Sequence, residues 1–377
     1  MTCTEPSLRF RPLVHAAGPF VSVFVDDRRD EADARERTLA RCSAVCRHLR
    51  DMGVDSGVVD DIGAALLSRQ PVPGRPGRAI VAAGSGVVVD ESLHAAPPST
   101  VLRVSDYPFL LPLLAPEQEP PDYLFAAVDS LGADLTVHEG SIRRHTSIEG
   151  AGFPVHKPAT AGWHGYGDLA HSAEEAVRTN IRLVSSAITT LADQADSEVV
   201  FVCGEVRARS AVIAELPERI AARTVQLPGG ADGDRADELH AREHLEAELE
   251  RHRRRQLDGV QDRFVAERAC GSGVAVEGLG AVCRALRDRC VDTLLVGEMG
   301  TATVLSGADR TTLGTDADFL SEIGQAPHSV VLADEALPFV ALATGATVIR
   351  ARGDLPLADG VGALLRYSPS LPPAFTS

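Results

Sequence analysis

The sequence is poor in lysine, tryptophan and methionine: its 377 residues include one lysine, one tryptophan and three methionines. Because Lys157 is the only lysine, the other 36 of the 37 basic residues are arginines. Acidic residues outnumber basic ones by 53 to 37, which gives a formal net charge of −16. A field of this sign repels phosphate backbones and anionic lipid at long range, so contact with nucleic acid requires a local basic patch.

Long apolar runs are also missing. No stretch approaches the roughly 18 apolar residues that a membrane span needs. The apolar stretch from Leu13 to Val25 is interrupted by polar and helix-breaking residues, and no small-residue cleavage site follows it, so we expect no signal peptide. The seven cysteines are an odd number without a Cys-x-x-Cys pair. This pattern favours reduced thiols and a cytoplasmic protein.

Signatures of several enzyme classes are absent from the sequence. There is no Gly-x-Ser-x-Gly elbow, no phosphate-binding loop ending in Gly-Lys-Ser/Thr, and no Gly-x-Gly-x-x-Gly that follows a strand. Nucleotide hydrolysis, serine acyl transfer and dinucleotide chemistry therefore have no support. We expect no catalytic residues, no cofactor and no metal.

One short motif offers a metal-dependent alternative. His240-Ala-Arg-Glu-His244 matches the His-x-x-Glu-His pattern of inverted zinc peptidases, in which two histidines hold the metal and the glutamate acts as base. The pattern fixes only three residues, and it lies on a predicted helix that is polar on nearly every face. The sequence favours a surface coincidence over a zinc peptidase.

The alternation of short apolar segments with helical periodicity predicts an α/β protein. Breaks rich in glycine and proline divide it into three consecutive α/β domains, residues 1–131, 132–270 and 271–377. We expect the third to be a three-layer α/β sandwich.

The middle domain contains a long segment without periodicity. Two predicted strands, 134–138 and 143–148, precede residues 150–171, and Ser172 with Glu175 has the spacing of a capping box. This spacing predicts that a long helix begins at Ser172, with an apolar stripe formed by Val177, Ile181, Val184, Ile188 and Leu191. Loops as long as 150–171 are uncommon in compact domains unless they have a function.

The composition of this loop indicates a binding surface. It holds the only lysine and the only tryptophan, together with three histidines and five glycines. Aromatic rings between glycines can stack on bases, and cationic side chains can contact phosphate near the positive end of the following helix. The candidate ribosome- and rRNA-binding residues are His156, Lys157, Pro158, Trp163, His164, Gly165, Tyr166 and Gly167.

Two other interpretations of the loop stay open. Trp163 and Tyr166 could pack the loop onto its own domain, where the histidines would only form hydrogen bonds. A metal site formed by His156, His164 and His171 is less favoured, because these spacings match no common ligand pattern.

Four segments give the chain a family resemblance: Gly-Pro-Phe-Val-Ser-Val-Phe-Val-Asp at 18–26, Val-His-Lys-Pro at 155–158, Gly-Trp-His-Gly-Tyr-Gly-Asp at 162–168, and Val-Asp-Thr-Leu-Leu-Val-Gly at 291–297. With these segments the chain resembles, over nearly its whole length, the bacterial relatives of the archaeal and eukaryotic class-one release factor and Pelota. Within them it is most similar to the actinobacterial branch that includes Balon-type ribosome hibernation factors. The most specific segments are 155–168 and 334–342.

The resemblance implies a position for each domain. The first domain would lie near the decoding centre of a vacant ribosomal A site, and the middle-domain loop would reach the peptidyl-transferase region. The third would contact the stalk base or a translational GTPase, which is elongation factor Tu in the Balon case. Release factors carry Gly-Gly-Gln in the matching loop, but this sequence has no Gly-Gly-Gln anywhere.

We therefore expect a non-enzymatic hibernation or stress factor that binds the A site and rRNA of the 70S ribosome and blocks tRNA access. One alternative is a diverged peptidyl-tRNA hydrolase or rescue factor that uses His156 or His164. Another is a homo-oligomeric stress protein that never meets the ribosome. If rRNA is the partner, we expect arginines to be segregated into patches on an acidic chain.

Overall fold

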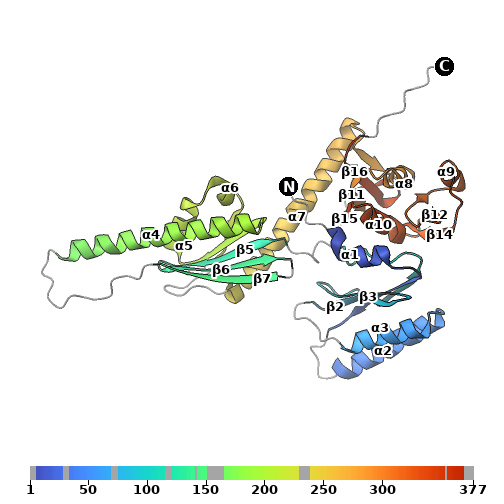
Figure 1. Ribbon diagram of the computed structural model, residues 1–377, viewed down its shortest axis with the longest axis horizontal. Coiled ribbons are helices and arrows are strands. Elements are labelled where there is room, and N and C mark those ends of the chain that lie inside the picture. The colour runs from blue at the N-terminus through green and yellow to red at the C-terminus, as the bar shows by residue number, and fades with distance from the viewer. Residues whose placement is uncertain are drawn as a thin grey trace, which may run out of the picture. The chain divides into compact units, whose positions relative to one another are not determined.

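The computed structural model describes residues 6–28, 34–68, 75–114, 121–140, 142–150, 165–228, 238–352 and 355–368. The chain divides into a middle unit, Glu119–Gln256, and a terminal unit that combines Met1–Gln118 with Leu257–Ser377. Each unit contains β-sheet and helices, which confirms the predicted α/β class (Figure 1). In the described part of the chain, every helix is too short or too polar to cross a membrane.

An antiparallel sheet, in the order β3-β2-β1-β4, forms the N-terminal part of the terminal unit. Its strands are β1 (Phe20–Asp26), β2 (Gly77–Ala83), β3 (Gly86–Leu93) and β4 (Val101–Ser105). The valines of β1 pack with α2 (Ala34–Asp51) and α3 (Ser56–Ser68), whereas Phe20 and Phe24 pack on the opposite side, where α1 (Pro6–His15) lies (Figure 1). Because both faces are covered, β1 is apolar along nearly its whole length.

Two further sheets form the C-terminal part of the terminal unit, in the orders β10-β16-β11-β15 and β13-β12-β14. The strands are β10 (Ala275–Glu277), β11 (Val291–Val296), β12 (Thr303–Ser306), β13 (Leu313–Gly314), β14 (Ser329–Leu332), β15 (Thr347–Arg350) and β16 (Val361–Leu365). The helical segments are α8 (Leu279–Arg287), α9 (Ala317–Ser321), α10 (Ala333–Ala343) and the short 3-10 helix η2 (Ala358–Gly360). α10 is buried over most of its length.

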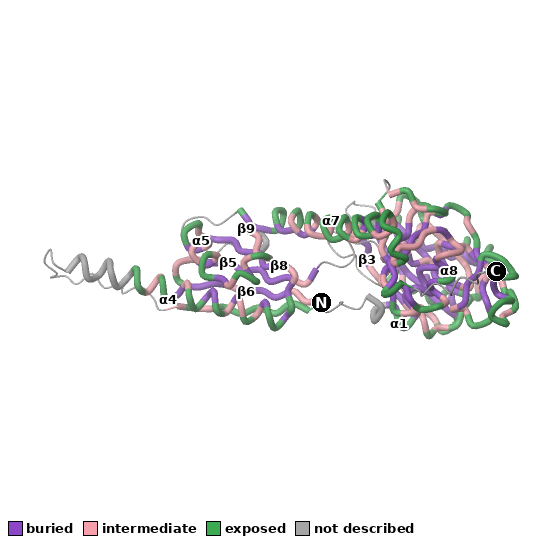
Figure 2. The backbone as a smooth tube through the Cα atoms, turned by 90° about the horizontal axis from the view of Figure 1, so that it is seen from above, coloured by how far each residue is buried: buried purple, intermediate pink, exposed green. Residues whose placement is uncertain are grey.

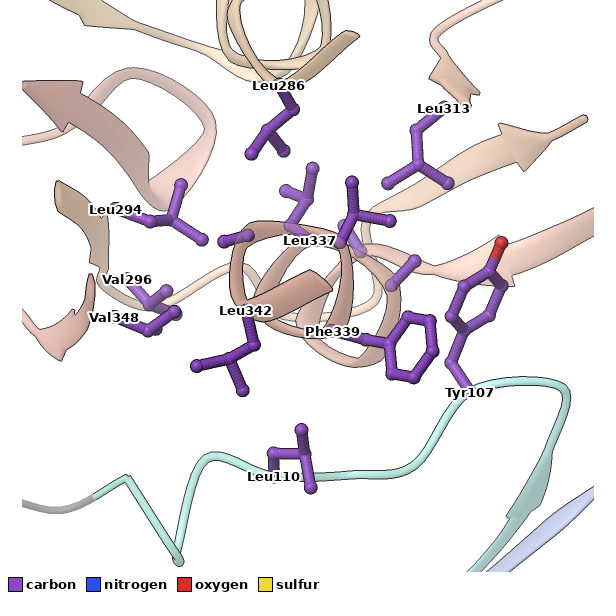
Figure 3. Packing of buried hydrophobic residues seen from close by; sticks show 14 of the residues in the cluster. Tyr107, Leu110, Leu286, Leu294, Val296, Leu313, Leu337, Phe339, Leu342 and Val348 are labelled. Atoms are coloured by element: carbon purple, nitrogen blue, oxygen red, sulfur yellow. The ribbon is translucent and has the colours of Figure 1, made fainter. Parts of the chain in front are cut away.

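One hydrophobic core joins the two parts of the terminal unit (Figure 3). The ring of Phe339 on α10 lies 6.3 Å from that of Phe20 and 5.4 Å from that of Tyr107, measured between centroids. The Arg310 guanidinium lies over the same three rings, at 5.1 Å from the Phe339 centroid, and donates to the Ala16 carbonyl oxygen at 3.1 Å. We predicted these two segments as the separate domains 1–131 and 271–377, and in the structure they share a core.

The middle unit is built on a five-stranded sheet in the order β7-β6-β5-β8-β9. Its strands are β5 (Tyr123–Val128), β6 (Gly132–Glu139), β7 (Ile142–Glu149), β8 (Val199–Gly204) and β9 (Thr224–Gln226). β5, β8 and β9 run parallel, and β6 and β7 form an antiparallel hairpin beside β5. β5 lies before the predicted boundary at residue 131, yet it pairs with both β6 and β8.

Helices cover both faces of this sheet. α4 (Gly165–Gln194), α5 (Val206–Glu215) and the short α6 (Glu218–Ala221) pack on the face of Leu124, Ala126 and Val128. α7 (Glu238–Cys270) packs on the other face through Ala241, Leu245 and Leu249, and its last turns belong to the terminal unit. β5 and β8 are therefore buried throughout (Figure 2).

The segment from Val206 to Ala221 forms two helices and not one continuous helix. α5 ends at Glu215, and Leu216 adopts an extended conformation immediately before Pro217. A proline disfavours the helical conformation of the residue before it, which accounts for the break.

Candidate functional site

The predicted loop residues divide into two groups in the structure. His156, Lys157, Pro158, Trp163 and His164 lie outside the described residues. Gly165, Tyr166 and Gly167 form the first turn of α4.

The prediction that the long helix begins at Ser172 was wrong. Ser172 and Glu175 lie inside α4, which begins at Gly165. His171 likewise lies within the helix, so residues 165–171 do not belong to a loop. No helix breaker stands between Asp168 and Ser172, and the helix continues toward its N-terminus despite a cost of about 1 kcal/mol for a glycine such as Gly167.

At its other end, the loop leaves the sheet through a close contact at Gly150. The Gly150 amide donates to the Leu131 carbonyl oxygen at 2.8 Å, and the buried Asn180 side chain of α4 donates to the Ser130 carbonyl oxygen at 3.1 Å. A β-carbon on Gly150 would overlap the Asn180 amide group. Only glycine therefore fits where β7 passes α4.

The rest of α4 is fixed to the middle unit by the predicted apolar stripe. Val184 and Ile188 are fully buried against the sheet, and Val177, Ile181 and Leu191 are partly buried. The Ser185 hydroxyl donates to the Val212 carbonyl oxygen of α5 at 3.2 Å. The N-terminal part of α4 extends past the end of the sheet (Figure 1).

A groove of about 740 Å³ lies between α4 and α5. It opens beside the carboxyl ends of the parallel strands β5 and β8, where α/β proteins commonly bind ligands. Its lining is Ser130, Glu174, Val177, Arg178, Ile181, Glu205, Arg207, Ala208, Ala211, Ala214 and Glu215. An apolar floor with both signs of charge at the rim suits the binding of an amphipathic group.

The β6–β7 hairpin ends in a basic edge strand, whose residues were not among the predicted site residues. All side chains of β7 except Ile148 are exposed, and the strand carries Arg143, Arg144 and His145 in succession. Arg144 forms an ion pair of 2.6 Å with Glu139. The cationic strand that leads into the loop could have been found from this run of three residues.

Charged residues at the start of β8 are linked to α7. His252 Nε2 lies 3.5 Å from a carboxylate oxygen of Glu198, and the Gln256 side-chain amide donates to the same oxygen. The contact with His252 and then the Gln256 hydrogen bond lower the pKa of Glu198 below its usual value, against the effect of burial. This cluster holds α7 on the sheet.

A second charge cluster connects the two parts of the terminal unit. Arg103 of β4 donates to Asp334 at 3.0 Å and to Glu335 at 3.0 Å, both in the first turn of α10. Burial raises the pKa of Glu335, although the hydrogen bonds from Ser105 and Arg103 oppose this shift. Negative charge is favoured at a helix start, and Arg103 adds an ion pair with both acids across the shared core.

The zinc-peptidase alternative gains nothing from the structure. Glu243 and His244 are exposed on α7, and the side chain of His240 is not described. Among the described residues, no group of three or more histidine, cysteine, aspartate or glutamate side chains is placed to hold a metal ion.

Comparison with known proteins now defines the family. Residues 122–270, which cover the whole sheet of the middle unit and α7, match the family described as bacterial archaeo-eukaryotic release factor family 2. Over this segment the protein is similar to the archaeo-eukaryotic release factors of bacteria. It belongs to one family with the Mycobacterium tuberculosis proteins Rv2629 (strain H37Rv) and MT2704 (strain CDC 1551), each described as uncharacterized. Each is 48% identical over 362 residues, which cover 96% of this chain and 97% of the relative.

Solved structures similar to this protein come from archaea and yeast. Archaeal translation termination factor aRF1 is 16% identical, with 96% of this chain and 97% of that chain covered and a TM-score of 0.26. Pelota of Archaeoglobus fulgidus is 16% identical, with 77% and 79% covered and a TM-score of 0.33. Dom34 of Saccharomyces cerevisiae is 10% identical, with 97% and 94% covered and a TM-score of 0.36.

Proposed function

We propose that this release-factor relative binds the ribosome, occupies the vacant A site of an idle 70S particle and blocks the access of tRNA. One observation carries the proposal. The middle unit matches a release-factor family model, but the chain has no Gly-Gly-Gln between β7 and α4 or elsewhere. In the proposal, the protein keeps the capacity to bind the ribosome. It lacks the Gly-Gly-Gln whose glutamine positions water for peptide release.

Occlusion of this kind requires binding and no chemistry. The base of the 151–164 segment supports such a role, because Gly150 and Asn180 fix one end and the buried stripe of α4 fixes the other. Gly165, Tyr166 and Gly167 form the first turn of α4. In the proposal, these residues and His156, Lys157, Pro158, Trp163 and His164 contact rRNA.

The physiological role that we propose is hibernation of the Balon type, in the cytoplasm and with elongation factor Tu as a candidate partner of the 271–377 segment. The six cysteines that the structure describes are free thiols, which supports a reducing compartment. Pull-down with purified elongation factor Tu in its GTP and GDP states tests the partner. Retention of neither form would remove that part of the proposal.

Sedimentation of the purified protein with idle 70S ribosomes through a sucrose cushion tests the function. We expect co-pelleting at physiological salt, and at least a tenfold loss of affinity when Lys157, Trp163 and Tyr166 are all replaced by alanine, on the order of 1.4 kcal/mol. The matched control replaces Arg242, Glu243 and His244, three consecutive exposed residues of α7. A wild-type protein that stays in the supernatant, or equal loss in both triple variants, contradicts the proposal.

A release assay separates occlusion from catalysis. Ribosomes loaded with peptidyl-tRNA are incubated with the protein, and released peptide is counted. We expect no release above the background of buffer alone. Release that disappears in the H156A or H164A variant would instead establish a hydrolase.

A further inference from the structure

Helix α2 of the terminal unit is basic in a strongly acidic chain. Its 18 residues include five arginines, Arg35, Arg37, Arg41, Arg47 and Arg50, as well as His48, against one glutamate and one aspartate. The whole chain, in contrast, has a net charge of −16. α2 is therefore a locally basic element, with five arginines against two acidic residues.

The fold directs most of this charge to solvent. α2 buries Thr38, Cys42, Val45, Cys46 and Leu49. Arg35, Arg37, Arg47, His48 and Arg50 are exposed, and Arg41 is partly buried. The buried side of α2 packs against the sheet and α3. The exposed arginines lie on its other side, and no other described helix covers them.

The exposed stripe has small residues between cationic ends. Arg37, Ala40, Ala44 and Arg47 follow each other at helical spacing, with Ser43 beside them, and all five residues are exposed. At about 1.5 Å per residue, Arg37 and Arg47 lie roughly 15 Å apart along the helix axis. Small side chains between them allow a groove-shaped anionic surface to approach the helix closely.

Both arginine-rich helices hold some of their arginines in ion pairs. On α7, Arg251 pairs with Glu248 at 2.8 Å and Arg254 with Glu250 at 2.8 Å. On α2, Arg41 lies 3.7 Å from Asp27, and Arg50 approaches Asp60 to 3.4 Å, with both side chains of the second pair largely exposed. Arg35 and Arg47 form no ion pair with any residue that the structure describes.

From this charge segregation we infer that the exposed face of α2 binds double-stranded RNA through its phosphodiester backbone. The wide, shallow minor groove of an A-form duplex accepts a helix with small residues on its outer face. Arginines at both ends of the stripe can then form bidentate hydrogen bonds with phosphates on either side of the groove. The inference concerns the terminal unit and RNA alone, so it does not depend on the proposed function.

Fluorescence anisotropy of the full-length protein with a labelled RNA duplex of about 16 base pairs tests the site. We expect binding that weakens steeply between about 50 and 200 mM salt. The R37A/R47A variant should bind at least tenfold more weakly at low salt, and its slope of log K against log salt should fall by about one per arginine. R37K/R47K keeps the charge and should retain most of the slope.

The matched control is R251A/R254A on α7, which removes the same charge from exposed, intrahelically paired arginines. We expect its affinity and salt slope to equal those of the wild type. Equal weakening of both double variants, or no binding of the duplex by the wild type at low salt, overturns the inference. Wild-type binding to anionic vesicles or an acidic peptide that exceeds duplex binding, and that R37A/R47A abolishes, also overturns it.

Discussion

Arg78 is the largest fully buried side chain among the residues that the structure describes. Its guanidinium forms a bidentate pair with Asp90, at 2.8 Å to each carboxylate oxygen. It also donates to the carbonyl oxygens of Ala65 and Leu66 near the end of α3. One side chain thus satisfies a carboxylate and the orphan carbonyls of a helix terminus.

Replacing Arg78 by alanine should lower the free energy of unfolding by about 3–5 kcal/mol, because it leaves Asp90 and two carbonyls without this donor. Urea denaturation of the purified variant measures the change. The comparison variant is Arg50→Ala, which removes an exposed ion pair with Asp60 and should cost less than about 1 kcal/mol. Similar losses in both variants would refute the assignment.

Glu198 should make stability depend on pH in the acid range. Its pKa is lowered in the folded protein, so its stabilising contribution is present above the ordinary glutamate pKa of 4.5 and is lost as pH falls through the folded pKa. The difference in unfolding free energy between wild type and Glu198→Gln should therefore be largest at neutral pH and shrink below pH 4.5. Denaturation curves at several pH values measure it, and a difference that is independent of pH contradicts the assignment.

Residues with a local role could be predicted from the sequence, and residues with distant partners could not. The carboxylate of Asp316 accepts from the Phe319 amide at 2.8 Å, a contact within one turn of the start of its own helix. Asp334 and Glu335 also stand at a helix start, but their partner Arg103 lies more than 200 residues away in the chain. No spacing rule reaches across such a distance.

At the scale of elements, the passage of β7 beside α4 depends on the absence of one side chain. Gly150→Ala should lower the free energy of unfolding by about 1–3 kcal/mol, because its β-carbon would overlap the Asn180 amide. In G150A/N180A the overlap is removed, so the two losses should be less than additive by at least about 0.5 kcal/mol. Thermal denaturation of both single variants and the double variant measures this coupling.

The control for this series is Gly259→Ala on α7, where a β-carbon meets nothing within 4 Å. Because alanine favours a helix over glycine by about 1 kcal/mol, this change should raise stability. Additive losses in G150A/N180A would show that the overlap is relieved by movement of the backbone.

The apolar periodicity of the sequence predicted whether a segment is a helix or a strand. It did not predict the residues at which the element begins and ends. The apolar stripe from Val177 to Leu191 predicted α4, and the β-branched run at Val21–Val25 predicted β1, because each pattern reflects the face that is buried. The start of α4 was missed because a capping-box spacing is a local signal that a continuing helix can override. The loop residues 156–164 stay predictions, since they lie outside the described residues.

At the scale of the whole molecule, the terminal unit should behave as one cooperative body. Phe339→Ala removes a ring that contacts Phe20 and Tyr107, and should cost about 3–5 kcal/mol. Hydrogen exchange should then accelerate in both β1 and β11, although they are separated by more than 250 residues, while β8 of the middle unit stays protected. Acceleration confined to β11 would contradict a shared core.

The composition of this unit from the two ends of the chain could not be predicted. Each end has its own strands, helices and apolar periodicity. This pattern is compatible with two separate domains and equally with one shared core. The pairing of Phe20 with Phe339 depends on shape complementarity between distant segments, which single-sequence patterns do not encode.

A discontinuous core also sets an order for assembly during synthesis. The middle unit, Glu119–Gln256, is complete once its own residues have left the exit tunnel. The side of the sheet that carries Phe20 and Phe24 is covered only after α10, near the end of the chain, has been synthesised. The nascent chain therefore exposes an apolar surface for most of its translation. We expect chaperones to bind its first hundred residues during this time.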